Sequence, residues 1–342
     1  MNRNVCVNGR YRVHRVTGMQ RYAREVVSRL PAEARVIAPG GWARGIPGHA
    51  WEQAVLPWRA AGSVLWSPCS TGPLGCRRHV VTIHDLAFVD QRDCFTRQFS
   101  AWYTWLVPRL ARRAARVITV SAFSRNRIAE YCRVSRERIV VTPLGVESRF
   151  RVLADETVDR VVERKGLSRP YVLSVASLEP RKNLGRLLLA WERLAPRYPD
   201  WHLVIAGGTG SVFRGAGLHG VPPRVAMLGY VDDDELVAVY GAAEAFVYPS
   251  IYEGFGLPVL EAMACGVPVV CGNATSLPEV AGDAAVLVDP LDVCSIASGV
   301  DRVLGDGGLR AELRARGLAR SRQFTWENTA RQTWAVLQEA AS

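Results

Sequence analysis

The stretch Pro249–Pro268, PSIYEGFGLPVLEAMACGVP, places two carboxylates, Glu253 and Glu261, eight positions apart. A Gly-Phe-Gly turn separates them, and a helical pattern begins near Pro258. Proline suits the first turn of a helix, and free amide groups there favour anions. The pattern predicts a glycine turn and a helix with Glu261 on its first turn, which suits a phosphorylated sugar. A buried strand, a tight turn and a core helix are the purely structural alternative.

The chain length and composition indicate a two-domain globular protein. Its 342 residues are enough for two sizeable cores, and hydrophobic residues make up 49% of them. Neither a signal peptide nor an apolar run of about 20 residues is recognisable, so we expect a cytoplasmic protein. Eight cysteines without Cys-x-x-Cys pairs or zinc-spaced histidines predict reduced, packed thiols.

The net charge of +11 is concentrated in the first half of the chain. Residues 1–150 hold 24 Arg against 9 acidic residues, whereas residues 151–342 hold 19 basic and 23 acidic residues. Such asymmetry favours a polyanionic partner, either nucleic acid or an anionic membrane surface. Arginine placed on ordinary solvated faces is the alternative.

Short β-branched runs alternate with helical patterns along the whole chain, which predicts parallel βαβ units. The strands predicted in the first half are Asn4–Asn8, Val36–Ala38, Ser63–Ser67, Val80–His84, Val117–Ser121 and Ile139–Thr142. Those predicted in the second half are Tyr171–Ala176, Trp201–Ala206, Val225–Leu228, Ala245–Tyr248, Val267–Val270 and Ala285–Val288.

The alternation pauses near residues 147–169 and then restarts. We therefore expect two doubly wound α/β domains, residues 1–150 and 151–325, facing a central cleft. The last helix, within residues 326–342, is expected to pack back onto the first domain. A basic, aromatic helix over residues 97–116, interrupted or kinked near Pro108, suits either a membrane interface or an ordinary core helix.

The segment Ser177–Asn183, SLEPRKN, follows the first strand of the second half. Ligands of open α/β sheets lie outside the carboxyl ends of the strands, and the adjacent Arg181 and Lys182 could clamp a diphosphate there. The lysine is informative because the chain has only two, Lys165 and Lys182, among 43 basic residues. A compact ammonium differs in chemistry from a guanidinium. A charged loop that opens a helix is the alternative.

Two further segments in the second half are easily misinterpreted. The run Gly207-Gly208-Thr-Gly-Ser211 allows a ligand to approach the backbone closely, but it is not the fingerprint of a dinucleotide site. The acidic run after Val231 resembles a metal site. A helical pattern follows at once, so capping and the helix dipole explain it better than metal binding.

Candidate residues in the first half follow its strands. Gly18 and Arg21 open a helix whose amide groups could meet a phosphate or an acceptor sugar. His84 and Asp85 end a buried strand and are either catalytic or hydrogen-bonded core residues. Ser121 ends the next strand, where capping alone could explain it.

Together these motifs resemble the retaining GT-B glycosyltransferases of glycosyltransferase family 4 over nearly the whole chain. The motifs that carry the resemblance are Asn8-Gly-Arg, Thr17–Tyr22, Thr82–Asp85, Thr119–Ser124, Pro143–Val146, Glu179–Asn183 and Glu253–Glu261. The first of these motifs, Asn8-Gly-Arg with Thr17–Tyr22, looks most like that of bacterial mannosyl- and rhamnosyltransferases that build surface polysaccharide.

The resemblance implies that the second of two Rossmann-like domains binds a nucleotide sugar. Arg181 and Lys182 would hold the diphosphate, Glu253 the donor sugar and Glu261 the ribose, while His84 would line the reaction centre. The other implied donor contacts are Gly207, Gly208, Val231, Gly254, Phe255, Gly256 and Leu257. The implied acceptor or cleft residues are Gly18, Arg21, Asp85 and Ser121. Several family members have another Arg where this chain has Ala176.

The implied reaction is transfer of a hexose, from GDP-mannose or a similar donor, with retention and without a metal or a cofactor. No nucleophile is evident, so we expect front-side attack in which the departing phosphate accepts the acceptor's proton. The expected partners are the nucleotide sugar, a saccharide or lipid-linked acceptor and an anionic membrane at its inner face, but no nucleic acid. The alternatives are a sugar-nucleotide hydrolase or epimerase, and a non-catalytic sugar-nucleotide-binding protein.

Overall fold

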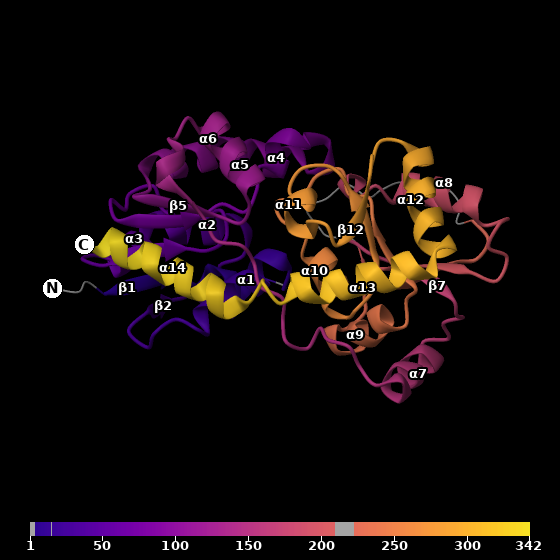
Figure 1. Ribbon diagram of the computed structural model, residues 1–342. Helices are drawn as coiled ribbons and strands as arrows, with labels where there is room; N and C mark the ends of the chain where they lie inside the picture. Colours follow the sequence, from indigo (N-terminus) through magenta and orange to yellow (C-terminus); the bar gives the residue numbers. More distant parts are fainter. Residues whose placement is uncertain (1–3, 15, 209–221) are drawn as a thin grey trace. The chain divides into compact units, whose positions relative to one another are not determined.

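The computed structural model describes residues 4–14, 16–208 and 222–342. The chain forms two compact units, which Figure 1 shows in the colours of the sequence. Unit 1 comprises Met1–Asp90, Gln98–Gly145 and Phe324–Ser342. Unit 2 comprises Gln91–Arg97 and Val146–Gln323. Among the described residues, no helix is long and apolar enough to cross a membrane.

Unit 1 is built on a parallel sheet that has six strands in the described part of the chain, in the order β2-β1-β3-β4-β5-β6. Its strands are β1 Val5–Asn8, β2 Arg35–Ile37, β3 Val64–Ser67, β4 His79–Thr82, β5 Arg116–Thr119 and β6 Ile139–Val141. In this doubly wound order the direction of winding reverses between β1 and β3, and ligands of such sheets lie at that point.

The helices of unit 1 cover its sheet. They are α1 Gly18–Val27, α2 Gly45–Ala54, α3 Leu56–Arg59, α4 Ala87–Asp90, α5 Arg97–Arg113 (which starts in unit 2), α6 Ala122–Cys132 and α14 Trp326–Ala341, with the 3-10 helices η1 Gly9–Val13 and η3 Arg136–Arg138. Of the interruption or kink expected in α5 near Pro108, the interruption is wrong, because the helix is continuous through this proline. Leu106 and Leu110, on either side of the proline, are fully buried, so packing keeps this stretch helical despite the missing amide hydrogen.

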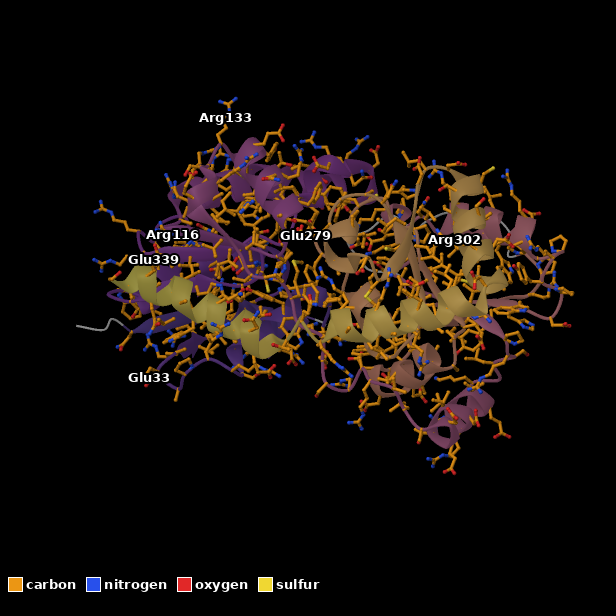
Figure 2. All side chains as sticks on the ribbon, viewed as in Figure 1. Glu33, Arg116, Arg133, Glu279, Arg302 and Glu339 are labelled. Atoms are coloured by element: carbon orange, nitrogen blue, oxygen red, sulfur yellow. The ribbon has the colours of Figure 1, made fainter. Side chains whose placement is uncertain are left out.

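Helix α14 comes from the far end of the sequence and packs against α1 in unit 1 (Figure 1). Its first residue, Trp326, is fully buried, and an added Cβ at Gly145 would lie only 2.2 Å from the Trp326 backbone nitrogen. Arg116 of β5 forms an ion pair with Glu339 near the end of this helix (Figure 2). The chain therefore closes unit 1 with its last helix.

Unit 2 contains a second parallel sheet, again with six strands in the described part of the chain, in the order β12-β11-β10-β7-β8-β9. Its strands are β7 Tyr171–Val175, β8 His202–Ala206, β9 Val225–Gly229, β10 Ala245–Tyr248, β11 Val269–Gly272 and β12 Ala285–Val288. This is the strand order of dinucleotide-binding domains, and its winding reverses between β7 and β10.

Helices also cover the sheet of unit 2. They are α7 Asp155–Arg164, α8 Leu184–Leu194, α9 Asp233–Gly241, α10 Leu257–Ala264, α11 Leu277–Ala281, α12 Val293–Gly305 and α13 Gly307–Ser321, with the 3-10 helices η2 Arg92–Cys94 and η4 Pro180–Lys182. Strands β10 and β11 are buried along their whole length, as expected of parallel strands with helices on both faces. The cysteines are all free, but Cys294 is exposed, so the expectation that every thiol is packed is wrong for this residue.

Candidate functional site

The candidate site of unit 2 lies where the winding of its sheet reverses. One loop follows β7 and contains η4, and the other follows β10 and leads into α10. A backbone hydrogen bond joins the loops, because the Ile251 amide donates to the Arg181 carbonyl at 2.8 Å. The two sequence motifs that carry the most charge therefore meet at one edge of the sheet.

Lys182 is the last residue of η4 and is 7% exposed. Its Nζ donates to Glu253 Oε1 at 2.5 Å and to the Tyr248 hydroxyl at 2.7 Å. Burial, and then the charge of Arg181, lower the pKa of Lys182, whereas Glu253 and Glu179 oppose this shift. The next residue, Asn183, has a left-handed backbone and anchors the loop by donating to the Pro249 carbonyl at 3.0 Å.

One oxygen of the Glu253 carboxylate accepts three hydrogen bonds. Its Oε1 accepts from Lys182, from the Tyr248 hydroxyl at 2.8 Å and from the Ser250 hydroxyl at 2.7 Å. Its Oε2 accepts from Arg181 at 3.2 Å. Burial alone would raise the pKa of Glu253, but Lys182 and Arg181 outweigh it and lower the pKa to about 2. Glu253 is therefore an ionised carboxylate.

Arg181 bridges two carboxylates. Its Nε and one terminal nitrogen donate to the two oxygens of Glu179, at 2.7 and 3.1 Å. The other terminal nitrogen donates to the Tyr252 carbonyl at 3.0 Å as well as to Glu253. Such forked pairs are strong and fix the plane of the guanidinium. The cluster thus contains two cations and two carboxylates, with Glu179 only 1% exposed.

The glycine turn after Glu253 is held by side chains from a distant loop. The Thr275 hydroxyl accepts from the Glu253 amide at 3.0 Å. The Ser276 hydroxyl lies 2.9 Å from the carbonyl oxygens of both Glu253 and Phe255, and its one hydrogen is donated between them. Gly256, with φ +112°, precedes α10 in a conformation that favours glycine. Thr275 and Ser276 follow β11, and no local pattern in the sequence points to them.

Glu261 lies farther along α10 than predicted. The helix starts at Leu257, one residue before Pro258, and its first turn contains no acidic residue, so the first-turn position was wrong. The side chain is buried, and the Tyr240 hydroxyl donates to its Oε2 at 3.1 Å. Burial and the Glu261 charge raise the pKa of Tyr240, which therefore stays a neutral donor.

The glycines after β8 support the same loop. The Gly207 amide donates to the Gly229 carbonyl at 2.7 Å, and the Gly208 carbonyl accepts from the Leu178 amide at 3.1 Å. Gly207 has φ +142°, and an added Cβ would lie 1.9 Å from the Ala176 carbonyl oxygen. Val231 is buried just before α9. Residues 209–211 of the glycine motif lie outside the described residues.

The remaining predicted site residues belong to unit 1. His84 lies two residues beyond the end of β4 and is buried. Its Nε2 lies 2.9 Å from the Pro68 carbonyl, which can only accept, so Nε2 carries a hydrogen. The ring meets Tyr22 edge-on at 4.8 Å, and burial lowers the pKa of His84. Asp85 accepts from the Ala87 amide at 3.0 Å where α4 begins.

The other predicted residues of unit 1 lie at helix starts. Ser121 is the N-cap of α6 and accepts from the Ser124 amide at 3.0 Å, as capping predicts. Gly18 is the first residue of α1, and Arg21 lies in its first turn. The structure thus brings Arg181, Lys182 and Glu253 into one cluster in unit 2, whereas the candidates of unit 1 belong to different helix starts and to the segment after β4.

Sequence reasoning missed a buried ionic cluster where the winding of the unit 1 sheet reverses. Glu52 of α2 is fully buried and accepts from Arg10 at 2.7 Å, from the Asn8 amide group at 2.7 Å and from the Thr71 hydroxyl at 2.8 Å. His49 lies on the same helix, 3.4 Å from the Glu52 carboxylate. Asn8 and Arg10 stand in a recognised motif, but nothing near Glu52 in the sequence marks it as their partner.

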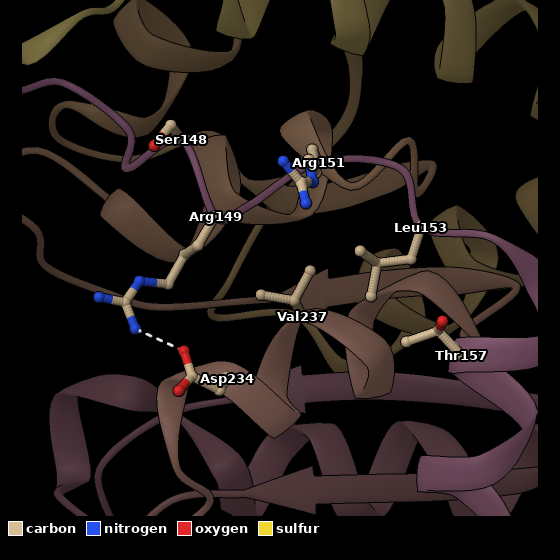
Figure 3. A pocket seen from close by; sticks show the side chains of 7 residues that line it. All are labelled: Ser148, Arg149, Arg151, Leu153, Thr157, Asp234 and Val237. Atoms are coloured by element: carbon tan, nitrogen blue, oxygen red, sulfur yellow. Dashed lines mark hydrogen bonds and ion pairs between the residues drawn. The ribbon is translucent and has the colours of Figure 1, made fainter.

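The acidic run after Val231 forms ion pairs. Asp232 occupies the N-cap position of α9 without a side-chain capping bond, while Glu235 pairs with Arg164 at 2.7 Å and with Lys165 at 2.6 Å. Asp234 pairs with Arg149 at 2.9 Å beside a cavity of about 370 Å³ (Figure 3). Within the described ranges, no group of three or more His, Cys, Asp or Glu could hold a metal.

Comparison with known families assigns the class of protein. The family described as "Glycosyl transferases group 1" matches residues 155–320, and the family described as "Glycosyltransferase Family 4" matches residues 54–150. An O-antigen chain mannosyltransferase B of Escherichia coli is 38% identical over 274 residues, which are 76% of this chain and 70% of that relative. A serotype-specific mannosyltransferase WbdA of the same species is 34% identical over 230 residues, 64% of this chain but 28% of the larger relative.

Solved structures share the fold at low sequence identity. HepE from Anabaena in complex with UDP-glucose superposes with a TM-score of 0.77 at 16% identity, covering 98% of this chain and 99% of that one. Sucrose-phosphate synthase from Thermosynechococcus elongatus gives 0.75 at 20% identity, covering 98% of each chain. The two doubly wound sheets are those of a GT-B glycosyltransferase. The chain belongs to the group 1 and family 4 glycosyltransferases, which confirms the predicted fold class and the resemblance.

Proposed function

We propose that this glycosyltransferase of polysaccharide biosynthesis moves a hexose, with retention, from a nucleoside-diphosphate sugar to a saccharide or lipid-linked acceptor. The observation that carries the proposal is the buried cluster of Lys182, Glu253 and Arg181 where the unit 2 sheet reverses its winding. Mannose is the first sugar to test, because relatives of this chain are named mannosyltransferases. GDP-mannose, a nucleoside-diphosphate form of mannose, is therefore the first donor to test.

In this proposal, the diphosphate, the sugar and the ribose of the donor each bind to a different group of unit 2. Lys182 binds the diphosphate, and the Glu253 carboxylate accepts a hydrogen bond from a hydroxyl of the sugar. Glu261 accepts from the ribose once its bond from Tyr240 is exchanged. Backbone groups of the turn over residues 254–257 meet the phosphate or the sugar.

The chemistry follows from where charge develops. The bond between the anomeric carbon and the phosphate oxygen breaks as a bond to the acceptor oxygen forms on the same face. The acceptor proton passes to the departing phosphate. Negative charge gathers on the nucleoside diphosphate, and preorganised positive groups stabilise such charge strongly. Lys182 and the first amides of α10 supply these groups, so we propose that no metal is required.

Unit 1 is proposed to bind the acceptor, with His84 lining the reaction centre. Its arginine-rich surface also carries exposed tryptophans, including Trp42 at 63% and Trp58 at 80% exposure. Basic and aromatic side chains together favour the interface of an anionic membrane. We therefore propose association with the inner face of the cell membrane, near a lipid-linked acceptor. Sedimentation with anionic and neutral vesicles tests this, and equal binding to both contradicts it.

One assay separates the proposed transfer from its alternatives. Purified protein is incubated with GDP-mannose, UDP-glucose and related donors, with and without a mannose oligosaccharide, in EDTA and in Mg²⁺. Transfer predicts an elongated saccharide with an α-linkage by NMR and equal rates in EDTA. Free sugar without an acceptor indicates a hydrolase, an altered sugar nucleotide indicates an epimerase, and thermal stabilisation without turnover indicates a binding protein.

A further inference from the structure

We infer that Glu179 and Arg181 form a fixed pair that positions Glu253, and that Lys182 is the side-chain cation that turns to the donor diphosphate. The inference rests on the proposed function and revises the expectation that Arg181 and Lys182 clamp the diphosphate together. Glu179 acts through Arg181 and is a positioning residue.

Arg181 is committed to protein partners. Its three nitrogens donate to both oxygens of Glu179, to Glu253 and to the Tyr252 carbonyl, at 2.7 to 3.2 Å. A guanidinium held by a forked carboxylate keeps one plane and one direction. Arg181 therefore presents Glu253 with a donor in a fixed place.

Releasing Arg181 to a ligand would leave Glu179 unbalanced. This carboxylate is 1% exposed, and Arg181 is its partner in an ion pair of 2.7 Å. A buried charge that loses its partner is strongly unfavourable. The hydroxyl of Ser177 also bonds Glu179, but it carries no charge to replace the guanidinium. The pair is therefore retained when a donor binds.

Lys182 can turn away at lower cost. Its ionic partner is Glu253, at 2.5 Å, and that carboxylate also accepts from Arg181, Tyr248 and Ser250. When the ammonium moves to a phosphate oxygen, Glu253 keeps one charged and two neutral donors. The freed position on Oε1 then accepts from a hydroxyl of the sugar. An ammonium on a flexible stem suits this exchange, whereas a forked guanidinium does not.

The two roles predict different losses in purified protein. Calorimetry measures the affinity for GDP or UDP, whichever matches the active donor, and turnover is measured with the corresponding GDP-mannose or UDP-glucose. Lys182→Met is expected to weaken binding of the nucleoside diphosphate about tenfold or more, since it removes a charged hydrogen bond. Glu179→Gln is expected to leave that affinity within about twofold but to lower kcat about 10²-fold, because it misplaces Glu253.

A spectroscopic measurement reports the positioning directly. In protein with ¹⁵N-labelled arginine, the Nε–H signal of Arg181 is assigned by its loss in Arg181→Lys. We expect this signal to shift and to exchange faster with water in Glu179→Gln, and to stay unchanged in the control Glu192→Gln, an exposed position on α8. If Glu179→Gln does not fold, Arg181→Lys keeps the charge but not the fork and should show the same split between affinity and kcat.

The outcomes separate the inference from the proposed function. Equal loss of nucleoside-diphosphate affinity in Arg181→Lys and Lys182→Met would make Arg181 a diphosphate ligand and overturn the inference. Unchanged kcat in Glu179→Gln, with an active wild-type protein, would overturn it while the proposed function stands. A wild-type protein that neither binds nor turns over any nucleotide sugar would overturn both.

Discussion

Lys182 and Glu253 form a buried ion pair of 2.5 Å, although they lie 71 positions apart on loops that follow different strands. Both residues are proposed to contact the donor, and in the free protein they bond each other. Donor binding then replaces this ion pair by a contact of Lys182 with the diphosphate and a contact of Glu253 with the sugar, while Arg181 and Glu179 stay in place. Groups held in place in this way need little rearrangement when charge develops on the leaving group.

Replacing Lys182 by alanine is expected to impair donor use far more than replacing the chain's other lysine. Lys182→Ala removes the ammonium from the proposed diphosphate position, and kcat/KM should fall about 10²- to 10³-fold. Lys165→Ala breaks an ion pair with Glu235 and should leave kcat/KM within about twofold. Steady-state kinetics with the active donor checks this. Unchanged donor affinity and turnover in Lys182→Ala would remove Lys182 from the phosphate site.

Acid should destabilise the protein in part through Glu253. The pKa of this carboxyl is lowered from 4.5 to about 2, so its contribution to stability is fully present above about pH 4.5 and is lost as the pH falls toward 2. A shift of that size corresponds to about 3 kcal/mol. In urea unfolding between pH 5 and 3, Glu253→Gln should show a shallower loss of stability than the wild type and Glu192→Gln. Parallel curves would contradict the ionised buried pair.

Gly207→Ala and Gly208→Ala form a matched pair at adjacent positions. A Cβ at Gly207 would collide with the Ala176 carbonyl in a backbone conformation of φ +142°, whereas a Cβ at Gly208 would have no atom of the described residues within 4 Å. We expect Gly207→Ala to lower the free energy of unfolding by at least about 2 kcal/mol, and Gly208→Ala by less than about 1 kcal/mol. Equal melting temperatures for the two variants would show that the loop moves to accept the methyl group at position 207 without loss of stability.

The buried carboxylate of unit 1 is expected to matter for stability. Glu52→Ala leaves Arg10 buried without its carboxylate, which should cost about 3–5 kcal/mol. Glu33→Ala, at an exposed position (labelled in Figure 2), should change the free energy of unfolding by less than about 0.5 kcal/mol. Chemical denaturation of both variants tests this. A loss below about 1 kcal/mol in Glu52→Ala would mean that water or another side chain replaces the pair.

Much of the fold could be predicted because its signals are local. Each strand is a short apolar run, and the alternation of such runs with helical patterns requires parallel βαβ units. Lys182 and Glu253 stood out for similar reasons, one as a rare lysine after a strand and the other beside a glycine turn. The continuity of α5 through Pro108 was not predictable, because buried contacts with the rest of unit 1 outweigh the local preference of proline.

The sequence by itself determined two doubly wound sheets, an uneven distribution of charge and a donor motif in the second half. Only the tertiary structure decided which groups pair: Arg181 with Glu179, Thr275 and Ser276 with the glycine turn, and Glu52 with Arg10. Local patterns follow from the preferences of neighbouring residues. Pairing across tens of residues follows from strand order and close packing, which bring distant loops to one sheet edge. A buried charge there is stabilised only by an opposite charge or a hydrogen-bond donor from another loop.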